Sequence, residues 1–127
     1  MGTTVNAAAV ARAALRHGRD VVLIPAGLMD HPEFDAQEDR AAAAAVLMAA
    51  EAMGEVILGE GARDYAHRRQ RIAAEGVEAL FAGAPHADKL RAIHMDADIA
   101  YCAQLDLTTA VPKGVGQDAL GVVLQRA

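Results

Sequence analysis

The fold is decided by the stretch Asp20–Ala50, whose sequence is DVVLIPAGLMDHPEFDAQEDRAAAAAVLMAA. Its first part, Val21–Ile24, is β-branched and aliphatic, is too short for a helix and has no polar face, which is typical of a strand buried on both sides of a sheet. Pro25-Ala26-Gly27 ends this segment. We therefore expect Val21–Ile24 to be a central strand.

A helix is expected after the loop that follows this strand. Asp35 and Glu38 have the spacing of a capping box, in which Asp35 accepts from a first-turn amide and Glu38 reaches back to the N-cap amide. After Asp39 and Arg40, the run Ala41–Ala50 is apolar on every face, and Gly54 offers a C-terminal stop. The pattern predicts a helix over Ala36–Met53 that packs on the strand, with buried residues that include Ala42, Ala45, Val46 and Ala49.

The rest of the chain favours further helices and two late strands. The helices are expected over residues 7–15, over 62–75 with an interruption at Gly76 and a second piece over 77–81, over 86–93 and over 99–105. Residues 55–58 fit either a short strand or a last helical fragment. Thr108–Val111 and Leu120–Leu124 are predicted to be antiparallel strands around the linker Gly114-Val115-Gly116. The expected architecture is one α/β domain over residues 1–127, with three α/β/α layers around a small mixed sheet.

Composition excludes two classes of partner. The net charge is −5, and the basic residues form no cluster interleaved with aromatic side chains, so we expect no nucleic-acid partner. The longest apolar run, Ala41–Ala50, is well short of the roughly 18 residues that span a bilayer, so we expect no membrane segment. The single cysteine, Cys102, fits a reducing cytoplasm, and its apolar neighbours indicate a packed core thiol rather than a nucleophile.

Acidic residues gather where the strand, loop and helix meet, which is where ligands bind in open α/β sheets. Asp35, Glu38 and Asp39 share one helical turn, and the loop before them carries Asp30 and Glu33. This much negative charge would repel a phosphate unless a cation such as Mg²⁺ stood between them, and Mg²⁺ needs only one or two protein carboxylates. The alternative is that the acids only favour the positive end of the helix.

Individual roles follow from these positions. If Glu38 is occupied with the helix cap, Asp39 is the better metal ligand. His31 is suited to protonate a leaving group near neutral pH, and Arg40 is suited to bind a phosphate. The other histidines show no metal-binding spacing and are expected to be exposed or capping residues.

Several motifs, taken in order, resemble one known family. They are Val5-Asn6-Ala7, Asp20–Gly27, Phe34–Asp39, and Leu90 followed by Asp98–Ala103 and Val111-Pro112. The series is similar to the C-terminal half of the 2-phosphosulfolactate phosphatase family. The resemblance implies an α/β/α fold and Mg²⁺-dependent hydrolysis of a phosphate monoester on a small sulfonated acid, a step in coenzyme M biosynthesis.

The positions of these residues and the resemblance together give a set of expected site residues and a partner. Glu38, Asp39 and His31 are the expected catalytic residues, Glu38 and Asp39 the expected Mg²⁺ ligands, and Asn6, Gly27 and Arg40 the expected substrate-binding residues. Because the family's N-terminal half has no counterpart in this chain, we expect a homodimer or a separate polypeptide to supply it. The alternative function is a non-catalytic α/β half-domain that binds a partner and has no turnover alone.

Overall fold

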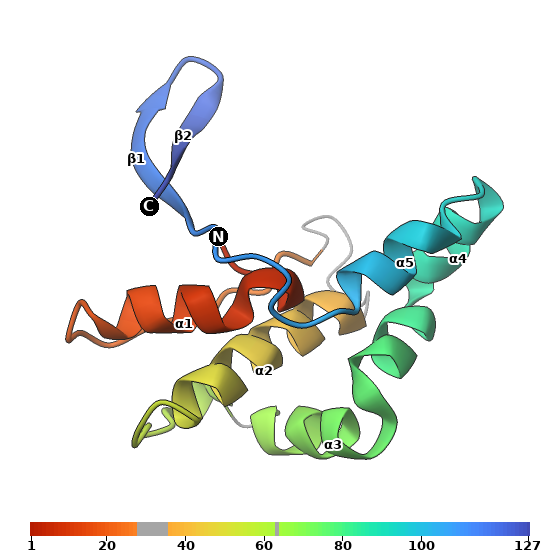
Figure 1. The fold of residues 1–127 in the computed structure, drawn as a ribbon, viewed down its shortest axis with the longest axis horizontal. Coiled ribbons are helices and arrows are strands. Elements are labelled where there is room, and N and C mark those ends of the chain that lie inside the picture. The colour runs from red at the N-terminus through yellow and green to blue at the C-terminus, as the bar shows by residue number, and fades with distance from the viewer. Residues whose placement is uncertain (28–35, 63) are drawn as a thin grey trace.

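The computed structural model describes residues 1–27, 36–62 and 64–127. Within these residues the chain forms a small mixed α/β fold with five α-helices and one antiparallel sheet of two strands (Figure 1). The α/β class predicted from the sequence is therefore confirmed. The elements in chain order are α1 (Ala7–Leu15), α2 (Gln37–Glu51), α3 (Tyr65–Ala82), α4 (Pro85–Ala92), α5 (Asp96–Cys102), β1 (Pro112–Asp118) and β2 (Gly121–Arg126).

The prediction of a central strand at Val21–Ile24 is wrong. These residues belong to no strand, and Val21, Val22 and Ile24 are 49%, 78% and 85% exposed. A strand needs a neighbouring strand to take its backbone hydrogen bonds, and among the described residues the sheet consists only of the β1–β2 hairpin. Figure 1 shows this hairpin extending away from the helices, so the described helices do not cover the two faces of a central sheet.

Helix α2 is the centre of the helical part, and its predicted position is confirmed to within two residues at each end. It packs against α1 on one side and α3 on another. Alanine at most of its contacting positions lets the neighbouring backbones approach closely, which explains a core with few large side chains. Of the predicted buried residues, Ala45 and Val46 are buried, whereas Ala42 and Ala49 are only partly buried. The cluster shared with α3 contains Ala41, Ala44, Tyr65, Ile72, Val77 and Leu80, and the cluster shared with α1 contains Ala7, Ala11, Ala45, Val46 and Ala50.

Helix α3 is interrupted where the sequence predicted. Gly76 has φ 80° and ψ 161°, a conformation that is essentially restricted to glycine, and the chain is helical on both sides of it. The helix ends at Ala82, with Gly83 as its C-terminal cap residue. Because of this break, the two helical parts of α3, before and after Gly76, run in different directions and both pack in the core.

The C-terminal hairpin is antiparallel as predicted, but the strand predicted at Thr108–Val111 is wrong, because β1 begins only after these residues, at Pro112. Gly114 pairs with Leu124, and the supposed Gly114–Gly116 linker lies inside β1. The turn forms instead at Asp118, whose Oδ1 accepts hydrogen bonds from the backbone amides of Leu120 and Gly121. Asp118 and Gly121 stand at the first and fourth positions of this turn, where aspartate and glycine are favoured, and Gly121 has positive φ.

The helices in the described part of the chain include none that is both long enough and apolar enough to cross a bilayer.

Candidate functional site

At the start of α2, Ala36 is the N-cap residue, and no side-chain cap hydrogen bond forms there. Asp35 lies outside the described residues, so the capping box predicted for Asp35 and Glu38 stays a prediction. Within the described residues, the carboxylate of Glu38 contacts a side chain from α4.

The partner of Glu38 is His86, the second residue of α4. The distance between Glu38 Oε1 and His86 Nδ1 is 2.5 Å, and the two side chains are 16% and 33% exposed. The other oxygen of Glu38, Oε2, is buried and has no hydrogen-bond partner among the described residues. The site thus contains a carboxylate with one oxygen fixed and the other shielded from solvent.

Asp39 is held by Gly27, so the structure brings two predicted site residues together. Asp39 Oδ2 accepts a 2.9 Å hydrogen bond from the backbone amide of Gly27, which has φ +62°. Glu38 and Asp39 thus have different partners, as expected for adjacent positions that diverge by about 100° around a helix. Asp39 thereby joins the segment that ends at Gly27 to the start of α2.

Arg40 and Asn6 are engaged within the chain. Arg40 Nη1 lies 3.4 Å from Asp64 Oδ2 in a largely exposed ion pair. Asn6 is 5% exposed, and its amide accepts from the backbone amide of Thr3 and donates to the carbonyl of Ala110. Its side chain thus connects the N-terminus to the segment before β1. His31 lies outside the described residues, so its predicted role stays a prediction.

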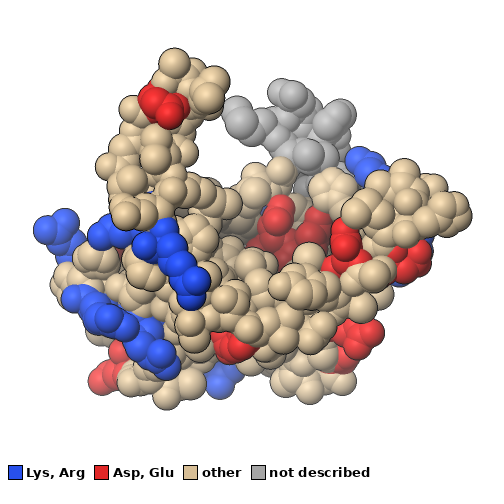
Figure 2. Space-filling view, turned by 45° about the horizontal axis from the view of Figure 1, so that its top comes forward, with Lys and Arg blue, Asp and Glu red and all other residues tan. Residues whose placement is uncertain are grey.

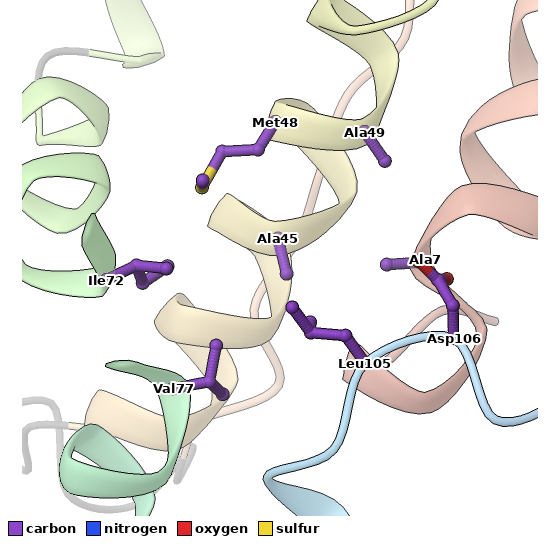
Figure 3. Close-up of a pocket in the computed structure, with 8 residues that line it drawn as sticks. All are labelled: Ala7, Ala45, Met48, Ala49, Ile72, Val77, Leu105 and Asp106. Atoms are coloured by element: carbon purple, nitrogen blue, oxygen red, sulfur yellow. The ribbon is translucent and has the colours of Figure 1, made fainter. Parts of the chain in front are cut away.

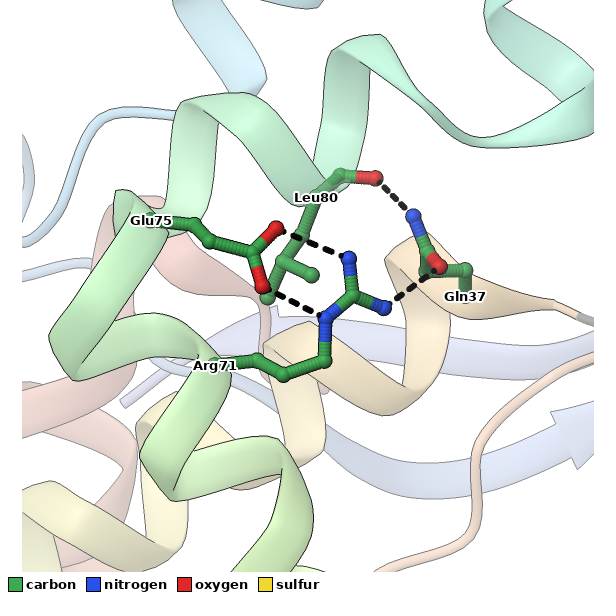
Figure 4. Close-up of polar contacts among 4 residues, drawn as sticks. All are labelled: Gln37, Arg71, Glu75 and Leu80. Atoms are coloured by element: carbon green, nitrogen blue, oxygen red, sulfur yellow. Dashed lines mark hydrogen bonds and ion pairs between the residues drawn. The ribbon is translucent and has the colours of Figure 1, made fainter.

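The start of α2 is fixed to both parts of α3 by a polar network (Figure 4). Gln37 donates to the carbonyl of Leu80 at 2.6 Å and accepts from Arg71 at 3.1 Å. Arg71 also forms a two-pronged ion pair with Glu75, at 2.9 and 3.0 Å, and this bond lowers the pKa of Glu75. Because Arg71 precedes the Gly76 break and Leu80 follows it, the network sets the position of the turn that carries Glu38 and Asp39.

The described residues include no group of three or more histidine, cysteine, aspartate or glutamate side chains placed to hold a metal ion. Mg²⁺ does not require such a group, because water and substrate phosphate complete its octahedral shell. The buried, unpartnered Oε2 of Glu38 is an oxygen donor of the kind that Mg²⁺ prefers. Figure 2 shows acidic side chains gathered in the hollow between the hairpin and the α4–α5 end of the molecule. The donor chemistry therefore fits a single Mg²⁺ held by few protein ligands.

Cys102 is exposed, so the prediction of a packed core thiol is wrong. It lies at the last residue of α5, where the helix end leaves the side chain uncovered. Partial burial and the nearby Asp98 carboxylate raise the pKa of the thiol. The thiolate form is thereby disfavoured.

An apolar cavity of about 220 Å³ lies farther along α2 (Figure 3). Its lining residues come from α1, α2, α3 and the segment after α5, and they are Ala7, Ala45, Met48, Ala49, Ile72, Val77, Leu105 and Asp106. The carboxylate of Asp106 already accepts from the backbone amide of Ala8, in the first turn of α1. The cavity contains none of the predicted site residues, and its lining offers little to a phosphate.

The His86 contact is what sequence reasoning missed. The available signal was Pro85, which favours the first position of a helix and so places His86 in the first turn of α4. Nothing local, however, indicates that this turn lies against the start of α2, because the two residues are 48 positions apart.

Comparison with known proteins identifies the family of this chain. A search of curated proteins finds no match. A family model described as 2-phosphosulpholactate phosphatase matches residues 1–117, which include all five helices of the described part of the chain and most of β1. The chain therefore belongs to the 2-phosphosulpholactate phosphatase family.

Proposed function

We propose that this protein hydrolyses the phosphate monoester of a small acid, with 2-phosphosulfolactate as the expected substrate and Mg²⁺ as the cofactor. The family match over residues 1–117 carries the proposal. The buried, unpartnered oxygen of Glu38 at the start of α2 supports the choice of a cation-assisted reaction.

Glu38 is the residue that we expect to hold Mg²⁺, with Asp39 in the same helical turn as the second predicted ligand. A bound Mg²⁺ would neutralise charge on the phosphate and orient it. Arg40 lies in this turn and is about half exposed, so its guanidinium is suited to bind a phosphate oxygen. Gly27 supports the site because its backbone amide donates a hydrogen bond to the carboxylate of Asp39.

The test is release of inorganic phosphate from 2-phosphosulfolactate by the purified full chain. We expect release that requires Mg²⁺ and stops when EDTA removes it. A matched substrate, phospholactate without the sulfonate, should react more slowly if the sulfonate is recognised. No release from either substrate, with Mg²⁺ present and the chain folded, would contradict the proposal.

A second candidate function, a half-domain that binds a partner, is favoured by the exposed apolar segments. Val22 and Ile24 are exposed and belong to no strand in the part of the chain that the structure describes, and the hairpin exposes apolar side chains such as Leu120 and Val122. A two-stranded hairpin alone is marginally stable in water, and open strand edges pair readily with other chains. We propose a second copy of this chain as the partner, because each copy exposes both this β-branched segment and a hairpin edge. In a two-fold dimer each copy can then complete the other.

Sedimentation velocity at micromolar concentration tests this assembly. We expect a dimer for the wild-type chain and a shift toward monomer for Val22→Lys. Ile57→Lys is the matched control, because Ile57 is 91% exposed but lies in neither segment. A compact wild-type monomer would contradict both the dimer and any active site that is shared between copies.

We also propose a cytoplasmic location. Its support is the cysteine content, since a single, exposed Cys102 fits a reducing compartment.

A further inference from the structure

We propose that His86 is a positioning residue that fixes the carboxylate of Glu38 for cation binding. His86 would hold Oε1, which favours Oε2 as the oxygen offered to Mg²⁺. This inference rests on the proposed phosphatase function, but its test measures Mg²⁺ binding and does not depend on turnover.

The contact itself has a defined chemistry. A carboxylate can only accept hydrogen bonds, so the proton between Glu38 Oε1 and His86 Nδ1 is donated by the imidazole. With 2.5 Å between the two atoms, the bond restricts rotation of the carboxylate group. His86 thereby occupies one lone pair of Oε1, which favours coordination of a cation through Oε2.

The second oxygen of Glu38, Oε2, suggests why this contact matters for function. A buried acceptor without a partner loses its hydrogen bonds to water and forms none within the protein, which folded proteins usually avoid. Oε2 of Glu38 is such an acceptor among the described residues. A divalent cation would compensate this loss, and one carboxylate oxygen is a normal share of the Mg²⁺ shell.

His86 is well placed to act as a rigid support. Ala84, the N-cap residue of α4, and Ala87, in its first turn, are each 3% exposed and anchor this turn in the core. Arg91 Nη2 donates to the carbonyl of Ala82 at 2.7 Å, which fixes α4 to the end of α3. The backbone of His86 is therefore positioned by packing that does not depend on Glu38. Histidine and carboxylate partners of this kind commonly change metal affinity by about 10–100-fold when they are removed.

A purely structural contact between α2 and α4 would behave differently. It would lower the unfolding temperature when broken, but the affinity for Mg²⁺ would not change as long as the chain stays folded. Cation affinity and thermal stability therefore separate the two roles.

The experiment is calorimetric titration of Mg²⁺ alone into the full chain and its variants, with the fold of each variant checked by circular dichroism. We expect Glu38→Gln to abolish binding at this site and His86→Ala to raise the Kd for Mg²⁺ by about 10-fold or more. His86→Asn, which retains a side-chain N–H donor, should recover part of the affinity and also covers the case in which His86→Ala fails to fold. His67→Asn is the matched control, because His67 is exposed on α3.

Two results would overturn the inference. The first is an unchanged Mg²⁺ affinity in both folded His86 variants, and the second is a wild-type chain that binds no Mg²⁺. If the wild-type chain still releases phosphate from 2-phosphosulfolactate in the first case, the proposed function stands without a role for His86. Absence of phosphate release in the wild type would instead contradict the proposed function itself.

Discussion

Replacing Ala45 with glutamate tests how α2 packs in the core. Ala45 is 5% exposed, belongs to the cluster between α1 and α2, and lines the cavity of about 220 Å³. The cavity has room for a longer side chain, so the added volume is not the main effect. The main effect is the charge, because the titratable group in the described lining, Asp106, is itself a carboxylate and offers no ion pair.

The expected destabilisation follows from that environment. An uncompensated buried charge costs roughly 3–5 kcal/mol, and we expect about 3 kcal/mol here because the cavity can admit water that partly solvates the carboxylate. A domain of this size has a stability of about 5–15 kcal/mol, so the change removes a large share of it. The corresponding fall in melting temperature is on the order of 10 °C.

The assay is thermal unfolding followed by far-ultraviolet circular dichroism at pH 7. Ala45→Gln, which has nearly the same size without the charge, should cost only about 1 kcal/mol. Ala43→Glu is the positional control, because Ala43 lies about 200° around the helix from Ala45 and is partly exposed. An Ala45→Glu variant that melts with the wild type would refute the placement of this helix face against α1.

Three further predictions concern the core and its polar contacts. Leu80→Ala should cost about 3 kcal/mol or more in denaturant unfolding, because Leu80 is 0% exposed, and a cost below about 1 kcal/mol would contradict its burial. Gly76→Ala should cost about 1–3 kcal/mol, because alanine is strained at φ 80° and ψ 161°; an unchanged unfolding midpoint would argue against the break in α3. Tyr65→Phe should cost about 1.5 kcal/mol at pH 7, since Tyr65 donates a hydrogen bond to Glu51. Burial and this bond raise the pKa of Tyr65 above its usual 10.0, so the difference between wild type and variant should be full below pH 10 and shrink above it, and a constant difference up to pH 12 would contradict this assignment.

Much of the helical structure was predictable because its signals are local. The Ala-rich run of α2, Pro85 at the start of α4 and Gly76 within α3 each act on their own few residues, and all three predictions are confirmed. The hairpin was predicted in type but misplaced, because the glycines at 114 and 116 were interpreted as its turn. The Asp118 and Gly121 pair was the stronger signal.

The structural features that were not predicted correctly depend on partners that are distant in the chain. Val21–Ile24 has the composition of a buried strand, but a strand forms only where another strand can pair with it. The Glu38–His86 contact likewise joins two helix starts that are distant in sequence, so no spacing rule could find it. The location of the site at the start of α2 came from chemistry and resemblance, and the assignment of partners within it required the structure.

The central claim is that the start of α2 carries a Mg²⁺-dependent phosphatase site, and phosphate release by Glu38→Gln tests it most directly. The rate should be compared with wild type and with Glu55→Gln, an exposed acidic position outside this turn, at saturating Mg²⁺ and matched protein concentration. We predict that Glu38→Gln lowers the rate on 2-phosphosulfolactate by about 100-fold or more while its circular dichroism spectrum matches that of the wild type, and that Glu55→Gln keeps the wild-type rate. Equal rates for the folded Glu38→Gln variant and the wild type would contradict the claim.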